Sequence, residues 1–169
     1  MSNYKTCFPP IVGDETQVIL LGSLPGEVSL HVKQYYAHPR NQFWHLLEDC
    51  LAVTLVKKSY RERLQTLKKH HIGLWDVVAQ ASRKGSLDTA LRDVTHNDLV
   101  GLLSRLPRLR LVAFNGCTAA RVAQRLTHLP FTLLQLPSSS PAYTLPYPVK
   151  LDQWKRIVGY LSPYTGSNQ

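Results

Sequence analysis

Residues 34–44 combine rings, amides and basic groups that could contact a nucleic acid base, in the order Gln-Tyr-Tyr-Ala-His-Pro-Arg-Asn-Gln-Phe-Trp. Aromatic rings suit base stacking, and the Arg, His and Asn beside them suit phosphate contact. Plainer interpretations fit the same residues. Phe43 and Trp44 could be core residues, Asn41 could cap the helix that follows, and His38 could lie in a turn. The segment alone therefore leaves a binding role and a packing role open.

Asn115, in the sequence Phe114-Asn115-Gly116, is a second side chain that could contact a base. An amide carries both a donor and an acceptor, so it can read the hydrogen-bonding edge of a base. The alternative is a turn between a strand and a helix, in which Gly116 adopts a positive φ.

Two loops contain residues suited to a negatively charged ligand. Residues 22–30 read Gly-Ser-Leu-Pro-Gly-Glu-Val-Ser-Leu, and their two glycines allow a ligand close to the backbone. Their spacing excludes a Walker A loop and a dinucleotide-binding loop. Residues 136–143 read Leu-Pro-Ser-Ser-Ser-Pro-Ala-Tyr, whose hydroxyl and N–H groups could grip phosphates. Each loop could also be an ordinary turn.

Only two carboxylates lie near predicted strand ends. The chain has 11 Asp and Glu residues, of which Glu27 lies in the first loop and Asp76 follows Leu74-Trp75. We expect Asp76 to cap or brace a loop, and Glu27 to assist chemistry at most. Seven histidines and three cysteines show no metal-ligand spacing, so we expect no metal, no iron–sulfur cluster and no other cofactor.

The apolar pattern predicts the elements that must position these residues. Short apolar runs that end in turn-forming or polar residues predict four buried strands, at residues 17–22, 72–77, 110–115 and 131–136. Helical spacing is found at residues 41–52, 60–70, 95–106, 117–126 and 151–161. Thr95 and Asp98 form a capping-box variant at the start of the third of these helices.

Strands that alternate with helices predict an α/β fold. We expect a three-layer α/β/α sandwich with a central, mainly parallel four-stranded sheet. Ligands bind such sheets at the carboxyl ends of the strands. The candidate segments follow predicted strand ends, so the fold would bring them together.

The composition fits one globular domain with an anionic partner. The chain has 169 residues, 44% of them apolar and 18% charged, and its net charge is +9. We expect a single domain over residues 1–169, with 164–169 as a loose tail. The charge suits nucleic acid or an acidic membrane surface. With no signal peptide and no run of about 20 apolar residues, we expect a cytoplasmic protein, nucleoid-associated in a prokaryote. We also expect a monomer, since no self-complementary apolar stripe is seen.

Taken together and in order, the four segments resemble the uracil-DNA glycosylase superfamily. The resemblance runs from residue 17 to 143 and is closest to the hypoxanthine-DNA glycosylase branch, family 6. The Ala-His-Pro-x-Asn-x-Phe-Trp stretch is also similar to the mismatch-specific uracil and thymine glycosylases. Leu24 stands where many members carry a catalytic Asp or Asn, and Leu136 stands where the uracil enzymes place a histidine. Both departures agree with the hypoxanthine branch, whose catalytic asparagine resembles Asn41.

The resemblance implies hydrolysis of the N-glycosidic bond of a deaminated base in DNA, with hypoxanthine as the first choice. The base must flip out of the duplex and leave with negative charge. We assign Asn41 to positioning the attacking water, Tyr36 to stacking on the base, and Asn115 to the edge of the base. Backbone N–H groups of the first loop would receive the leaving charge; the residues concerned are Gly22, Ser23, Leu24 and Gly26. The expected DNA contacts are Ser138, Ser139, Ser140, Tyr143, Arg40, Lys33, Arg83 and Lys84.

Tyr143 or its neighbours would fill the gap that the flipped base leaves in the duplex. No lysine lies in a motif as a Schiff-base nucleophile, so we expect a monofunctional enzyme that leaves an intact abasic site. Three alternatives remain open. The substrate could be uracil or a G·T or G·U mismatch, or the chain could be a nucleic-acid-binding module without catalysis. The third alternative, a hydrolase of small nucleosides, is disfavoured by the charge of +9.

Overall fold

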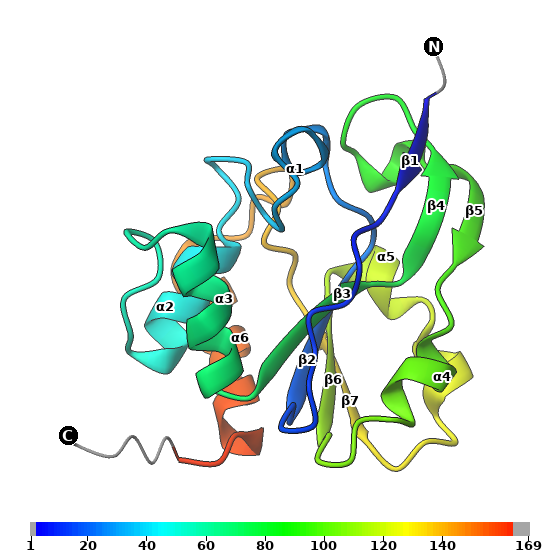
Figure 1. The fold of residues 1–169 in the computed structure, drawn as a ribbon. Helices are drawn as coiled ribbons and strands as arrows, with labels where there is room; N and C mark the ends of the chain where they lie inside the picture. The colour runs from blue at the N-terminus through cyan, green and yellow to red at the C-terminus, as the bar shows by residue number, and fades with distance from the viewer. Residues whose placement is uncertain (1–2, 164–169) are drawn as a thin grey trace.

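A four-stranded parallel sheet forms the centre of the computed structural model, which describes residues 3–163 (Figure 1). Its strand order is β3-β2-β6-β7, and each neighbouring pair runs parallel. The bounds are Ile72–Asp76 for β3, Val18–Gly22 for β2, Leu111–Asn115 for β6 and Thr132–Leu136 for β7. All four predicted strands are therefore confirmed, and each is one residue shorter than predicted.

Helices cover both faces of this sheet and give the predicted three layers (Figure 1). Val18 and Leu20 of β2 face one core, to which α2, α3 and α6 contribute side chains. Ile19 and Leu21 face the opposite core, with side chains from α4 and α5. The bounds are Phe43–Leu51 for α2, Tyr60–Lys69 for α3, Tyr147–Trp154 for α6, Leu99–Leu103 for α4 and Cys117–Ala120 for α5. Since successive residues of a strand point to opposite faces, a strand buried on both faces is apolar throughout.

A second, antiparallel sheet was not predicted. It has the order β1-β4-β5, with bounds Tyr4–Thr6, Val78–Ser82 and Arg92–His96. The predicted start of the third helix at Thr95 is wrong, because Thr95 lies in strand β5. The N-cap of α4 is instead Asp98, whose side chain accepts a hydrogen bond from the N–H of Gly101 at 3.0 Å. The capping box is absent, because Thr95 lies in a strand and the third residue of α4, Gly101, has no side chain to bond back to the N-cap.

The remaining elements are short. Helix α1, Glu27–Val32, occupies part of the segment predicted to be a loop. Three 3-10 helices are η1 Asp88–Ala90, η2 Ala123–Leu126 and η3 Lys155–Tyr160. The last two follow α5 and α6, so each of the last two predicted helices is an α-helix followed by a 3-10 segment. No helix within residues 3–163 is long and apolar enough to cross a membrane. The predicted loose tail lies outside the described residues.

The carboxyl ends of the parallel strands bring the candidate segments together at one edge of the sheet. Gly22 ends β2 and is paired in register with Asp76, which ends β3. Asn115 ends β6 and is paired with Leu136 at the end of β7. The segment before α2 joins this edge through Gln42, whose backbone N–H donates to the loop after β7 at 3.0 Å.

Candidate active site

Tyr36 provides an aromatic platform at this edge. Its ring stacks on the buried ring of Phe43, with centroids 3.8 Å apart and planes 11° from parallel. Phe43 is fixed in turn by an edge-on contact with Trp154, at 5.7 Å between centroids. The backbone of Tyr36 is left-handed, with φ of 54°, which is uncommon for a bulky residue and is concentrated at functional sites. Because Phe43 covers one face of the ring, a base can stack only on the other.

Gly22 lies against the carboxyl group of Asp76 and the hydroxyl group of Tyr36. A Cβ placed on Gly22 would lie 2.6 Å from Oδ1 of Asp76 and 2.8 Å from the hydroxyl of Tyr36. Only glycine therefore leaves room for both side chains. The Tyr36 hydroxyl and Oδ2 of Asp76 are buried and make no hydrogen bond within residues 3–163. Buried polar atoms are nearly always paired in folded proteins, so two orphans beside one glycine indicate a place for a polar ligand.

Asp76 is 3% exposed and does not brace a loop through its carboxyl group. The backbone oxygen of Asp76 accepts from Nδ2 of Asn97 at 2.7 Å, but its side chain makes no hydrogen bond to any residue that the structure describes. The pKa of this carboxyl is raised to about 7, chiefly by burial and also by nearby Asp88, while Arg83 opposes the shift. A buried acid with this pKa is substantially protonated at neutral pH, so it can donate a hydrogen bond as well as accept one.

The same surroundings shift the pKa of the Tyr36 hydroxyl. Burial raises the pKa of its hydroxyl, the Asp76 carboxyl raises it further, and the neighbouring Asn115 side chain lowers it. No hydrogen bond of good geometry joins Tyr36 to Asn115. The phenol is therefore neutral and keeps both a donor and an acceptor for a ligand.

The loop after β2 is fastened from outside by residues 83–88. The hydroxyl of Ser23 donates to Asp88 at 2.6 Å, and the Arg83 guanidinium donates to the carbonyl of Pro25. Arg83 is 1% exposed, so the predicted phosphate contact of this residue is wrong. The hydroxyl of Ser86 accepts the backbone N–H of Glu27 at 2.9 Å, which completes the attachment.

The side chains of Leu24 and Glu27 in the first loop are also occupied by contacts within the protein. Leu24 is buried in the core beside α4, so its backbone alone can face a ligand, as predicted from its type. The carboxylate of Glu27 pairs with Lys5 at 2.8 Å. The backbone N–H groups of Ser23, Leu24 and Gly26 form no hydrogen bond within residues 3–163. The loop therefore offers unused donors close to Gly22.

Asn41 lies one residue before Gln42, the N-cap of α2, and keeps groups free for a ligand. Its Oδ1 accepts the backbone N–H of Phe43 at 3.0 Å, at the start of α2. That bond fixes the direction of the side chain, while a second lone pair on Oδ1 and both Nδ2 protons remain unused by residues 3–163. The N-cap is Gln42, so the capping interpretation of Asn41 is wrong, although its side chain does accept the first N–H of the helix from the preceding turn. This bond is compatible with a role in positioning water.

Asn115 is held by Ser139 from the neighbouring strand end. Its Nδ2 donates to the Ser139 hydroxyl and its Oδ1 accepts the Ser139 N–H, both at 2.9 Å. Gly116 has φ of 97°, the turn geometry that the sequence allowed as an alternative. Because one Nδ2 proton and one lone pair of Oδ1 remain, Asn115 can still contact a base while it is rigidly placed.

The serine loop, defined as residues 137–143, has two hydroxyls prepared to donate. Oγ of Ser138 accepts the N–H of Ser140 at 3.1 Å, and Oγ of Ser140 accepts the N–H of Ala142 at 3.2 Å. Each hydroxyl proton therefore stays available for an anion. Ser139 is buried against Asn115, whereas Tyr143 is 48% exposed. The other predicted phosphate contacts, Lys33, Arg40 and Lys84, are all exposed.

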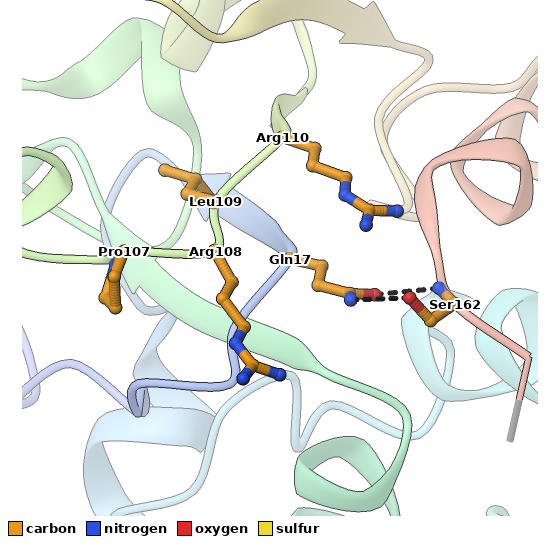
Figure 2. Close-up of a pocket in the computed structure, with 6 residues that line it drawn as sticks. All are labelled: Gln17, Pro107, Arg108, Leu109, Arg110 and Ser162. Carbon is orange, nitrogen blue, oxygen red and sulfur yellow. Dashed lines mark hydrogen bonds between the residues drawn. The ribbon is translucent and has the colours of Figure 1, made fainter. Parts of the chain in front are cut away.

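A large hollow lies at the opposite end of the sheet and is not part of this site. Figure 2 shows its six lining residues: Gln17, Pro107, Arg108, Leu109, Arg110 and Ser162. Its volume is about 450 Å³, and Gln17 and Arg110 precede β2 and β6 at their amino ends. The amide of Gln17 is already satisfied by two hydrogen bonds of 2.8 Å with Ser162. Elsewhere within residues 3–163, no group of three or more His, Cys, Asp or Glu side chains could hold a metal ion.

Known proteins with similar sequences and folds identify the family. The family model of the Uracil DNA glycosylase superfamily matches residues 9–160. Hypoxanthine DNA glycosylases of Methanosarcina acetivorans and Methanosarcina barkeri are each 40% identical over 138 residues, covering 82% of this chain and 87% of theirs.

A solution NMR structure of a Methanosarcina acetivorans protein assigned to the uracil DNA glycosylases has a TM-score of 0.84 and 36% identity. It covers 92% of this chain and 96% of its own. The family predicted from the four segments is confirmed. This chain belongs to the uracil DNA glycosylase superfamily.

Proposed function

We propose that this protein is a DNA glycosylase of base excision repair that removes hypoxanthine from DNA and leaves an abasic site. The observation that carries the proposal is the pair of buried, unpartnered oxygens of Tyr36 and Asp76 beside Gly22. Its place at the carboxyl edge of the sheet is where such folds bind ligands. Membership of the superfamily and the hypoxanthine DNA glycosylases among its relatives support the choice of substrate.

The flipped base stacks on the face of Tyr36 that Phe43 does not cover. A 6-oxopurine presents an N1–H donor beside a carbonyl acceptor. Asp76 in its neutral form offers the matching acceptor and donor, and Asn115 supplies a further amide for the edge of the base. The orphaned Oδ2 of Asp76 would then be paired.

Asn41 positions the water that attacks the sugar. An amide oxygen is too weakly basic to take a proton, but it can hold a water in line with the anomeric carbon. The hydrogen bond from Phe43 keeps that oxygen in one orientation. This suffices for a reaction in which the sugar has oxocarbenium character before the nucleophile arrives, because the nucleophile need not be strong.

The first loop stabilises the departing base. As the glycosidic bond breaks, negative charge develops on the base, and preformed donors placed at that charge lower the barrier. The unused N–H groups of Ser23, Leu24 and Gly26 are such donors, and Gly22 permits the approach. The attachment of this loop to residues 83–88 keeps the donors in place before substrate binds.

Exposed groups around the edge hold the DNA. Ser138 and Ser140 donate their hydroxyl protons to phosphates, while buried Ser139 braces Asn115. Lys33, Arg40 and Lys84 add positive charge at the surface. Tyr143 is exposed enough to fill the space left by the flipped base. We also propose, from the sequence alone, that the enzyme acts as a monomer without a covalent intermediate.

Base release from matched duplexes tests this function. We would compare deoxyinosine with deoxyuridine, each as one residue in the same oligonucleotide, and read alkali-labile abasic sites. Release from deoxyinosine should exceed release from deoxyuridine, and Asn41→Ala should lower it by on the order of a hundredfold or more. Preference for deoxyuridine or a G·T mismatch would favour the uracil alternative. Binding without any release would favour a non-catalytic DNA-binding module, and a covalent adduct trapped by borohydride would contradict the monofunctional mechanism.

A further inference from the structure

Lys150 on α6 is a buried cation beneath the serine loop. The residue is 1% exposed. Its ammonium donates to the carbonyl of Tyr143 at 2.7 Å, to Oε1 of Gln42 at 3.0 Å and to the carbonyl of Ser140 at 3.4 Å. The three protons of the ammonium are thus all used by neutral acceptors. The same group lies 5.3 Å from the centroid of the Tyr143 ring.

The charge of Lys150 has no counter-ion in the described protein. Within residues 3–163 the ion pairs are Lys5 with Glu27 and Arg108 with Glu15. Burial lowers the pKa of Lys150, with no carboxylate to oppose the shift. Removing a charge from water is unfavourable unless it is paired, and neutral donors such as an amide could satisfy carbonyls at lower cost. A structural role in holding the loop does not by itself account for a cation there.

The serine loop is the surface that this charge can act on. Its carbonyls at 140 and 143 turn inward to Lys150, and the carbonyl of Pro137 turns inward to Nε1 of Trp154 at 2.9 Å. Ser138 and Ser140 keep their hydroxyl protons for an external acceptor. An anion on this loop would therefore meet two hydroxyl donors and, behind them, an unpaired positive charge in a low-dielectric setting.

We propose that Lys150 supplies the positive charge of a phosphate site on the serine loop, and that a backbone phosphate of bound DNA is its counter-ion. The proposal rests on the proposed function for the identity of the ligand. Lys150 is a positioning residue, because it acts on the phosphate through the loop and does not touch it. Its bond to Gln42, the neighbour of Asn41, also ties this phosphate site to the residue that positions water.

The salt dependence of DNA binding separates a charge from a structural brace. We would measure the affinity for an undamaged fluorescent duplex by anisotropy at several KCl concentrations. Lys150→Gln keeps donors without charge, Lys150→Met removes both, and Lys150→Arg keeps the charge. Lys69→Met is the matched control, since Lys69 is exposed at the end of α3, at the amino end of the sheet.

We expect Lys150→Gln and Lys150→Met to weaken binding about tenfold at low salt and to reduce the salt slope by about one. Lys150→Arg should keep the slope of the wild-type protein, as should Lys69→Met. Weaker binding in all three Lys150 variants with an unchanged salt slope would overturn the proposal. Lys150 would then have only a structural role in holding the serine loop. If Lys150→Met melts below the assay temperature, Lys150→Gln decides.

Base release from deoxyinosine would be followed separately for the same proteins. Binding to undamaged DNA does not require catalysis, so the two proposals fail independently. A changed salt slope without base release in the wild-type protein would refute the glycosylase and keep the phosphate site.

Discussion

Two polar sites, the hollow around Gln17 at the amino end of the parallel sheet and the candidate site at its carboxyl end, differ in whether their hydrogen-bonding groups are paired. At the amino end, a hollow of about 450 Å³ contains Gln17, and both atoms of its amide are paired with Ser162. At the carboxyl end, the Tyr36 hydroxyl and an oxygen of Asp76 are buried without partners. An amide that is already paired in this hollow is explained by folding alone. Unsatisfied groups are unfavourable in the empty protein, and a ligand that pairs them accounts for their presence.

Gly22→Ala should have the largest effect of the substitutions that probe this contrast. The new methyl group would lie 2.6 Å from an Asp76 oxygen and 2.8 Å from the Tyr36 hydroxyl, so both side chains must move. Because small displacements of reacting groups are expensive, we expect base release to fall by about a hundredfold. Single-turnover kinetics would measure this loss. Gly13→Ala is the matched control, since nothing lies within 4 Å of that position; equal losses in both variants would contradict the assignment.

Asp76→Asn should change the pH dependence of the reaction. If the neutral acid contacts the base, activity of the wild-type protein is present below the pKa of about 7 and falls about tenfold per pH unit above it. The amide does not ionise, so the variant should lack this decline. Base release at saturating enzyme from pH 5 to 9 would show the difference. An identical decline in both proteins would exclude Asp76 as its source.

The pH dependence of stability tests the raised pKa of Asp76 independently of activity. The pKa of Asp76 is higher in the folded than in the unfolded protein, so its protonation stabilises the fold at low pH. That contribution is lost as pH rises from about 4 to 7. Asp76→Asn should therefore gain stability relative to the wild-type protein between pH 5 and pH 8, as measured by urea unfolding.

The sequence was sufficient for the central sheet because its strands are buried on both faces. Each is a short apolar run, a pattern that needs no tertiary information to recognise. Strand β5 is exposed along its whole length, and β4 begins two residues after β3 ends, so neither shows as a separate apolar run. The antiparallel sheet and the true start of α4 were missed for that reason.

The candidate site was predictable as a set of segments and not as a set of contacts. Asn41 and Tyr36 could be named from their neighbours in the sequence. The pairing of Asn115 with Ser139 and the bond from Lys150 to Gln42 join residues 24 and 108 positions apart. Only the fold brings those residues together, and no sequence pattern marks Lys150 as buried.

Tyr36→Phe should lower activity less than Gly22→Ala does, without lowering the stability of the fold. Removing a buried hydroxyl without a partner should leave stability unchanged or raise it by up to about 1 kcal/mol. If the hydroxyl bonds a group of the bound nucleotide other than the base stacked on its ring, kcat/KM should fall about fivefold, the value of one hydrogen bond. Urea unfolding and steady-state base release would be compared on the same preparation. A loss of stability would show that the hydroxyl is paired in the free protein.

Gln17→Ala should have the smallest effect on activity and the opposite balance of effects. The substitution removes two hydrogen bonds between the start of β2 and the segment after η3, and it leaves the N–H of Ser162 without its partner (Figure 2). We expect a loss of about 1–2 kcal/mol in the free energy of unfolding and no change in base release below the melting transition. A drop in base release larger than the one in Tyr36→Phe would mean that the amino end of the sheet controls the chemistry. The contrast between the paired amide of Gln17 and the unpaired oxygens of Tyr36 and Asp76 would then not identify the active site.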